Sequence, residues 1–191
     1  MKSCCKADGP LIRRQGIRPK NASLQSARNV KNDEFYTRLS DIETELACYQ
    51  GHFCGKIIYC NCDNPEHSQF WRYFKLHFME LKLKKLIATH YDPVKPVYAT
   101  ICEAEGAHIK ETRTQLGQNG DFRSEECVKI LEQADIVVTN PPFSLWREYI
   151  AQLIAHQKAF LIIGPINALT YKDVFPLVRS NRVWLGSTQV K

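Results

Sequence analysis

The sequence predicts an α/β protein built on a mainly parallel, doubly wound sheet. About five short apolar runs, rich in β-branched residues, alternate with amphipathic stretches along the 191 residues. Right-handed crossovers between parallel strands place helices on both faces of such a sheet. A hydrophobic content of 44% and a charged content of 24% are ordinary for a globular chain, and the length suffices for one domain with a sizeable core.

A first strand-helix-strand unit begins with the apolar run over residues 56–62. The next helix is expected over residues 68–81, where phenylalanines recur every four positions. Residues 85–89 form the second strand. Both strands end in polar turns that contain a carboxylate, Asp63 after the first and Asp92 after the second.

The other elements follow from the same periodicities. A helix upstream of the first strand is expected to be capped by Ser40 or Asp41 and to fade near Gly51. The remaining elements are a strand over 97–102, a hairpin or long loop over 106–120, helices over 125–133, 144–156 and 167–175, and strands over 136–138, 158–163 and 182–185.

Residues 1–30 carry many basic and few large apolar side chains, which predicts a flexible basic N-terminal arm. Such an arm could contact a phosphate backbone, although a merely solvated terminus has the same composition. The formal net charge of +6 and the sequence pI of about 8.9 suit an anionic partner such as nucleic acid, but many proteins without such a partner share them.

The eight cysteines indicate a reduced protein rather than a disulfide framework, because no signal-like apolar segment opens the chain. No apolar run approaches the roughly 18–20 residues of a membrane span, so a cytoplasmic protein is expected. A zinc site is the alternative use of the thiols. Its candidate ligands are Cys54, Cys60, Cys62, His67 and His77. Their spacing lacks paired Cys-x2-Cys units, so buried strand cysteines are favoured and no metal is predicted.

The buried run over residues 136–138 ends at Asn140-Pro-Pro-Phe143. Two prolines remove two backbone donors, so the chain leaves the sheet there. In open α/β sheets, ligands bind at the carboxyl ends of strands.

The residue types in this turn suit chemistry at an exocyclic amino group of a nucleobase. The Asn140 side-chain oxygen and the Pro141 carbonyl could accept the amino hydrogens, and Pro142 keeps the turn rigid. Phe143 could stack on a base taken out of the duplex. An electrophile held opposite would complete a methyl transfer by proximity. The alternative is a proline-rich turn that only redirects the chain.

Four segments carry a family resemblance. Asn140-Pro-Pro-Phe143 resembles the catalytic Asn/Asp-Pro-Pro-aromatic motif of S-adenosylmethionine-dependent amino-methyltransferases. Together, in this order, the segments look like the EcoRI-type adenine-specific DNA methyltransferase family over about residues 28–190. They are Asn32-Asp-Glu-Phe-Tyr-Thr37, Tyr59-Cys-Asn-Cys-Asp63, Gly120-Asp-Phe-Arg-Ser124 and Asp135-Ile-Val-Val-Thr-Asn-Pro-Pro-Phe-Ser144.

The resemblance implies a Rossmann-like methyltransferase fold and methyl transfer from S-adenosylmethionine to the exocyclic amino group of adenine in double-stranded DNA. It assigns roles by position. Phe35, Tyr36 and Thr37 match the segment at the methionine end of the cofactor, Asn61 and Asp63 the first-strand cofactor motif, Asp92 the ribose ligand, Asp121 and Phe122 the segment flanking an adenine, and Asn140 to Phe143 the catalytic loop. From spacing alone, Asp121 could equally be a local cap.

The resemblance also implies that residues 31–191 form the N-terminal part of a catalytic domain. Related enzymes continue further, so the sheet is expected to be incomplete at its C-terminal side and the target-recognition region to be absent. A restriction endonuclease could share the system, although no stable protein partner is implied. Two alternatives stay open: an inactive remnant that binds cofactor or nucleic acid, and an amino-methyltransferase that acts on RNA or protein.

Overall fold

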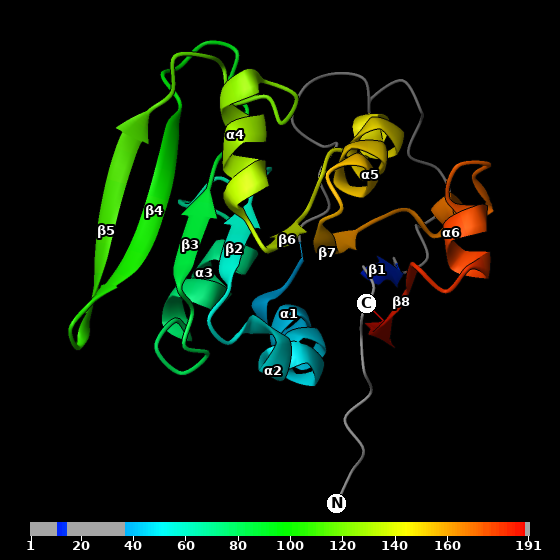
Figure 1. Ribbon diagram of the computed structural model, residues 1–191, viewed down its shortest axis with the longest axis horizontal. Coiled ribbons are helices and arrows are strands. Elements are labelled where there is room, and N and C mark those ends of the chain that lie inside the picture. Colours follow the sequence, from blue (N-terminus) through cyan, green and yellow to red (C-terminus); the bar gives the residue numbers. More distant parts are fainter. Residues whose placement is uncertain (1–10, 15–36, 190–191) are drawn as a thin grey trace, which may run out of the picture.

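The computed structural model describes residues 11–14 and 37–189 of the chain. Within them, eight strands form one sheet in the order β5-β4-β3-β2-β6-β7-β1-β8 (Figure 1). The strands are β1 (Leu11–Arg14), β2 (Ile57–Cys60), β3 (Lys85–Ala88), β4 (Tyr98–Glu105), β5 (His108–Gln115), β6 (Ile136–Thr139), β7 (Ala159–Ile163) and β8 (Trp184–Gln189). The helical elements are α1 (Leu39–Leu46), η2 (Ala47–Tyr49), α2 (Gln50–Phe53), α3 (Gln69–Leu76), α4 (Glu125–Gln133), η3 (Phe143–Leu145), α5 (Trp146–Ala155), η4 (Ile166–Thr170) and α6 (Phe175–Arg179).

The centre of the sheet is parallel, as predicted. Strand β2 pairs in parallel with β3 on one side and with β6 on the other, and β7, β1 and β8 continue the parallel arrangement. Strands β4 and β5 form an antiparallel hairpin beyond β3. This arrangement confirms the predicted α/β class. Of the range predicted as a hairpin or long loop, residues 106–115 complete the hairpin, and residues 116–120 form a loop after it.

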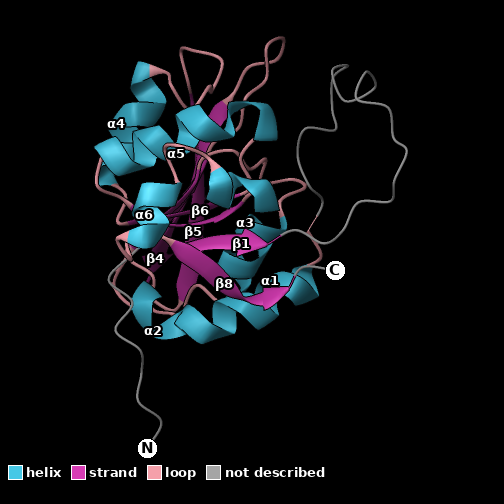
Figure 2. Ribbon diagram, turned by 90° about the vertical axis from the view of Figure 1, so that its right-hand side faces the viewer, coloured by secondary structure: helices cyan, strands magenta, loops and turns pink. Residues whose placement is uncertain are grey.

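Helices cover both faces of the sheet because alternate side chains of each strand enter different cores. On β2, Ile58 and Cys60 belong to the core beneath α1 and α3. Tyr59 lies between them and belongs to the core beneath α4 and α5. Figure 2 shows the sheet between these two groups of helices. The carboxyl ends of the parallel strands are thereby left for the loops that carry polar residues.

Helix α1 begins at Leu39, so the prediction that Ser40 or Asp41 caps it is wrong. Arg38 holds the N-cap position and makes no side-chain capping bond. The start lies earlier because Leu39 packs against the core beneath the helix. Asp41 instead lies in the first turn, where an acidic side chain interacts favourably with the positive end of the helix dipole.

Helix α3 is shorter than its phenylalanine repeat predicts, since it ends at Leu76. Phe78 and Leu81 nevertheless stay buried in the same core, in turns rather than in helix. Lys82, with φ of 51°, completes the reversal into β3. The apolar repeat therefore identified the buried face correctly but extended the helix too far.

The flexible arm predicted for residues 1–30 is wrong for residues 11–14. Their backbone forms β1, which lies between β7 and β8 and pairs in parallel with both. Apolar Leu11 and Ile12 supply the short β-prone stretch that the basic composition of the segment obscured. The rest of the predicted arm lies outside the described residues.

Candidate functional site

The loops that leave β2 and β6 meet at the carboxyl edge of the sheet. The two strands are parallel neighbours, so their last residues emerge side by side. The Cys62 amide donates to the hydroxyl of Thr139 over 3.1 Å, and that hydroxyl donates to the carboxylate of Asp63. Thr139 is fully buried. It therefore joins the exit of β2 to the residue that immediately precedes Asn140.

Asp63 is the buried carboxylate at the centre of this junction. Ser68, the N-cap of α3, donates its hydroxyl to Asp63 over 2.5 Å, and the backbone amide of Asn140 donates to it as well. Burial raises the pKa of Asp63 from 3.8 to about 6, against the hydrogen bonds from Ser68, Thr139 and Asn140, which lower it. The carboxylate is thus costly to ionise and is held by three donors that favour the ionised form.

Two cavities lie at this edge of the sheet, and Cys62 lines both. The first has a volume of about 190 Å³, and Thr37, Asp63 and Asn140 are among its lining residues. The second has a volume of about 330 Å³. Its lining residues are Asn61, Cys62, Tyr91, Gly120, Asp121, Phe122, Arg123, Pro142 and Leu145. Among the described residues, Cys62 is the one that the two linings share.

One wall of the second cavity depends on Tyr149 of α5. Its hydroxyl donates to the side-chain oxygen of Asn61, and its ring meets Phe122 edge to face, with centroids 5.0 Å apart and planes at 76°. Burial raises the pKa of Tyr149 well above its usual value, so the hydroxyl stays protonated and can donate. The Asn61 side-chain nitrogen is buried and has no hydrogen-bond partner among the described residues.

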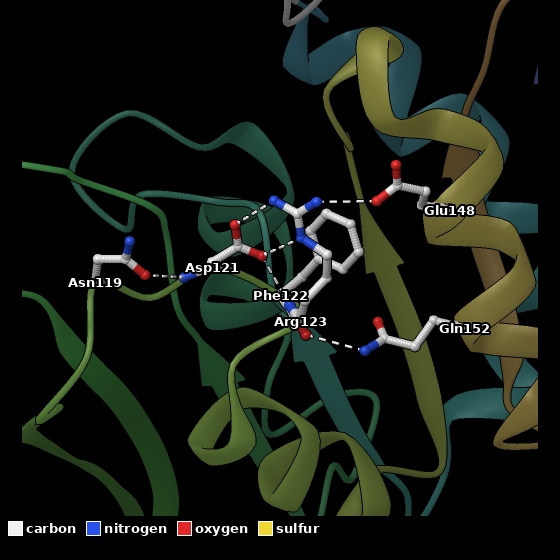
Figure 3. A network of polar contacts seen from close by, with 6 residues as sticks. All are labelled: Asn119, Asp121, Phe122, Arg123, Glu148 and Gln152. Carbon is white, nitrogen blue, oxygen red and sulfur yellow. Dashed lines mark hydrogen bonds and ion pairs between the residues drawn. The ribbon is translucent and has the colours of Figure 1, made fainter.

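The loop before α4 is held by a network of polar contacts (Figure 3). Arg123 binds both carboxylate oxygens of Asp121, at 2.9 and 2.7 Å, and reaches Glu148 of α5 at 2.9 Å. Gln152 of α5 donates to the backbone carbonyl of Phe122 over 3.1 Å. The hydrogen bonds and charge of Arg123 lower the pKa of Asp121. Asp121 therefore faces the cavity as a carboxylate that already has a bidentate partner.

The Asn140-Pro-Pro-Phe143 loop joins β6 to α5 through η3. Asn140 is 9% exposed and lines the first cavity, while Pro142 lines the second. The Pro142 carbonyl accepts a bond from the Leu145 amide over 3.2 Å, which closes the turn. Phe143 is half-buried, packs against both cores and lines neither cavity. The loop thus divides its residues between the two cavities.

Not every predicted site residue reaches these cavities. The carboxylate of Asp92 accepts from the amides of Val94 and Lys95 at 2.9 and 3.0 Å, which lower its pKa, and it lines a separate cavity of about 260 Å³. Asp92 therefore caps its own turn. Phe35 and Tyr36 lie outside the described residues, whereas Thr37 lines the first cavity.

Residue patterns did not single out Thr139, Ser68, Arg123 or Tyr149 for the site. One signal could have found Tyr149. It lies on the apolar face of α5, and a buried tyrosine hydroxyl needs a polar partner. Ser68 was readable as an N-cap before an apolar repeat, but its second bond to Asp63 depends on the tertiary fold.

The described cysteines form no disulfide bonds; they are Cys48, Cys54, Cys60, Cys62, Cys102 and Cys127. The described residues also contain no cluster of three or more histidine, cysteine or acidic side chains that could hold a metal ion. Among the helices of the same residues, none has the length and apolar character needed to cross a membrane.

Comparison with known proteins places these features in a family. The family model described as "Adenine-specific methyltransferase EcoRI" matches residues 23–191. The Type II methyltransferase M.EcoRI of Escherichia coli is 45% identical over 180 residues, with 87% of this chain and 55% of the relative covered. The Type II methyltransferases M.MpnI of Mycoplasma pneumoniae and M.MgeORF184P of Mycoplasma genitalium are 42% and 41% identical, each over 85% of this chain and 50% of the relative.

No solved structure gives a significant match. The chain spans about half the length of the curated relatives it matches. Most of its described residues, including both cavities and the Asn-Pro-Pro-Phe loop, lie within the matched range. The chain belongs to the EcoRI family of adenine-specific methyltransferases.

Proposed function

We propose that this chain carries the cofactor and catalytic sites of an adenine-specific DNA methyltransferase of the restriction-modification type. The observation that carries the proposal is the position of Asn140. It follows a buried strand, lines a cavity beside Asp63 and begins a proline-proline turn whose Pro142 lines a second cavity. Its relatives are Type II methyltransferases by name, which supports the same activity here.

S-adenosylmethionine is the proposed methyl donor. The residues that line the two cavities fit such a molecule. Asp63 and Thr37 line the first cavity and offer acceptors to an ammonium group. The second cavity offers apolar walls at Phe122, Pro142 and Leu145 to a flat base, together with the unpartnered amide nitrogen of Asn61. When bound, S-adenosylmethionine supplies an electrophilic methyl group attached to a positively charged sulfur.

The residues of the loop act on the acceptor. The Asn140 side-chain oxygen and the Pro141 carbonyl accept hydrogen bonds from the two N–H groups of the exocyclic amine. These bonds help to localise the lone pair on the amino nitrogen. The bonds of Thr139 and of the Asn140 amide to Asp63 hold this loop in place without contact to the substrate. Phe143 is proposed to stack on the adenine, which requires its half-buried ring to turn towards the cavities.

Double-stranded DNA is the proposed substrate, with the net charge of +6 as modest support. A cytoplasmic location is part of the same proposal. The same loop chemistry would serve an RNA or protein amino group, so the acceptor needs a direct comparison. An inactive chain that only binds cofactor is the third possibility.

Transfer of a radiolabelled methyl group to duplex DNA, RNA and peptide tests these alternatives. We expect label in duplex DNA only, and a loss of at least about 10²-fold for Asn140→Ala. Asn167→Ala, at an exposed position away from both cavities, is the matched control and should keep the full rate. Methyl transfer by Asn140→Ala at the wild-type rate would refute the mechanism. Calorimetric binding of S-adenosylmethionine without label in any acceptor would select the inactive alternative.

A further inference from the structure

Tyr149 is fully buried on α5, the helix that follows the Asn-Pro-Pro-Phe loop. It contacts two residues that line the second cavity. Its hydroxyl reaches Asn61 at the exit of β2, and its ring supports Phe122 before α4. Those two residues come from separate loops and both line the cavity. One side chain therefore supports a polar and an aromatic part of the same wall.

The contact with Asn61 determines which end of its amide is available. The side-chain oxygen accepts from Tyr149, and the thiol of Cys62 lies 3.9 Å from the same oxygen as a second, weak donor. Asn61 is only 1% exposed, and its nitrogen has no partner among the described residues. Buried amide N–H groups are nearly always paired in folded proteins, so an unpaired one beside a cavity points to an acceptor on a ligand.

We propose that Tyr149 is a positioning residue that fixes the Asn61 amide so that its N–H group recognises an acceptor atom of an adenosine moiety in the second cavity. The inference rests on the proposed function. It adds to that function the residue that sets the orientation of the donor. A ring nitrogen of adenine is the acceptor that suits a flat ligand placed against Phe122 and Leu145. Both the cofactor and the target nucleotide contain this moiety, and the two can be separated by experiment.

A purely structural role for the Tyr149 hydroxyl makes a different prediction. In that case, its removal would lower stability and leave the recognition of the ligand unchanged. A positioning role requires that ligands with and without the ring nitrogen respond differently to the same substitution. The decisive readout is therefore the dependence of affinity on single ring nitrogens.

Calorimetry with S-adenosylhomocysteine provides the first measurement. Tyr149→Phe keeps the ring against Phe122 and removes only the hydroxyl. We expect its dissociation constant to rise about tenfold, the equivalent of one hydrogen bond. Tyr73→Phe is the matched control, because Tyr73 is a buried tyrosine of α3 that lines none of the three cavities described. Its affinity should match that of the wild type.

Analogues of S-adenosylhomocysteine in which one ring nitrogen is replaced by C–H provide the second. In the wild type, one of the 1-, 3- and 7-deaza analogues should bind about tenfold more weakly than the parent. That difference should fall below about twofold in Asn61→Ala. If Asn61→Ala does not fold, the same comparison in Tyr149→Phe decides, since its deaza penalty should also shrink.

The same variants are titrated with a duplex that contains adenine. A loss of affinity for S-adenosylhomocysteine alone assigns the cavity to the cofactor, and a loss for duplex alone assigns it to the target base; both outcomes support the inference. The inference is overturned if the wild type binds, Tyr149→Phe binds both ligands as tightly as the wild type, and Asn61→Ala shows the same deaza penalties as the wild type. That result leaves the proposed function standing. A wild type that binds neither ligand overturns both.

Discussion

Replacing Thr139 by valine tests whether its hydroxyl holds the exits of β2 and β6 together. Valine keeps the shape of the side chain and removes an atom that both donates to Asp63 and accepts from the Cys62 amide. A donor left buried without a partner costs about 1–3 kcal/mol, and a hydrogen bond to a charged group contributes about 1.5–3 kcal/mol. The two effects share one site and do not add fully, so we expect a loss of about 3 kcal/mol.

Urea unfolding at pH 7 measures that loss against a typical domain stability of about 5–15 kcal/mol. Thr139→Ser is the control, because it restores the hydroxyl and removes only a methyl group, at a cost near 1 kcal/mol. The loss in Thr139→Val should shrink at pH 5, where Asp63 is largely protonated in the folded state and its hydrogen bond is weaker. Equal losses in the two variants, or a loss in Thr139→Val below about 1 kcal/mol, would refute the role of the hydroxyl.

Three further predictions concern the same edge of the sheet. Burial raises the pKa of Asp63 from 3.8 to about 6, so the folded state keeps a proton that the unfolded chain loses at lower pH. Its contribution to stability should therefore grow as pH falls from about 6 to about 4, and the difference in unfolding free energy between the wild type and Asp63→Asn should change by up to about 3 kcal/mol across that window. Gly120→Ala should cost more than about 3 kcal/mol in a thermal or urea melt, because Gly120 has φ of +73° and a Cβ there would lie 2.0 Å from a backbone oxygen. Gly106→Ala, with φ of +63° and open space around it, should cost only about 1–2 kcal/mol. Arg123→Gln should raise the pKa of Asp121 towards its usual value in a carboxyl NMR titration while changing stability by less than about 1 kcal/mol, since the Arg123 side chain is 49% exposed; an unchanged Asp121 pKa would contradict the bidentate contact.

The sequence was sufficient for features that depend on local patterns. Helix α4 lies at residues 125–133, as predicted, and Ser124 is its N-cap; a serine before an apolar repeat is a local signal of a helix start. The sheet class followed from alternating apolar runs in the same way. The predicted start of α1 failed because the core contact of Leu39 decided it, and that contact depends on tertiary structure.

The candidate site shows the same difference between local patterns and tertiary contacts. Asn61, Asp63, Asp121 and Asn140 reach the cavities because each follows a strand or precedes a helix at the ligand-binding edge. Asp92 occupies an equivalent place along the chain, yet its carboxylate turns to its own loop amides. Whether loop amides or a ligand take such a carboxylate depends on the turn that forms after the strand.

The topology explains why residues far apart in sequence support one site. The chain moves from β2 outward to β3 in one direction, and β6 lies on the other side of β2. This is the switch point of the sheet, where loops from neighbouring strands turn to opposite faces and leave a crevice between them. Thr139 and Tyr149 both belong to the segment that follows the crossover, and both contact the exit of β2. The segment that supplies the Asn-Pro-Pro-Phe loop therefore also orders the loop proposed to bind the cofactor, so a change in either contact should alter binding and methyl transfer together.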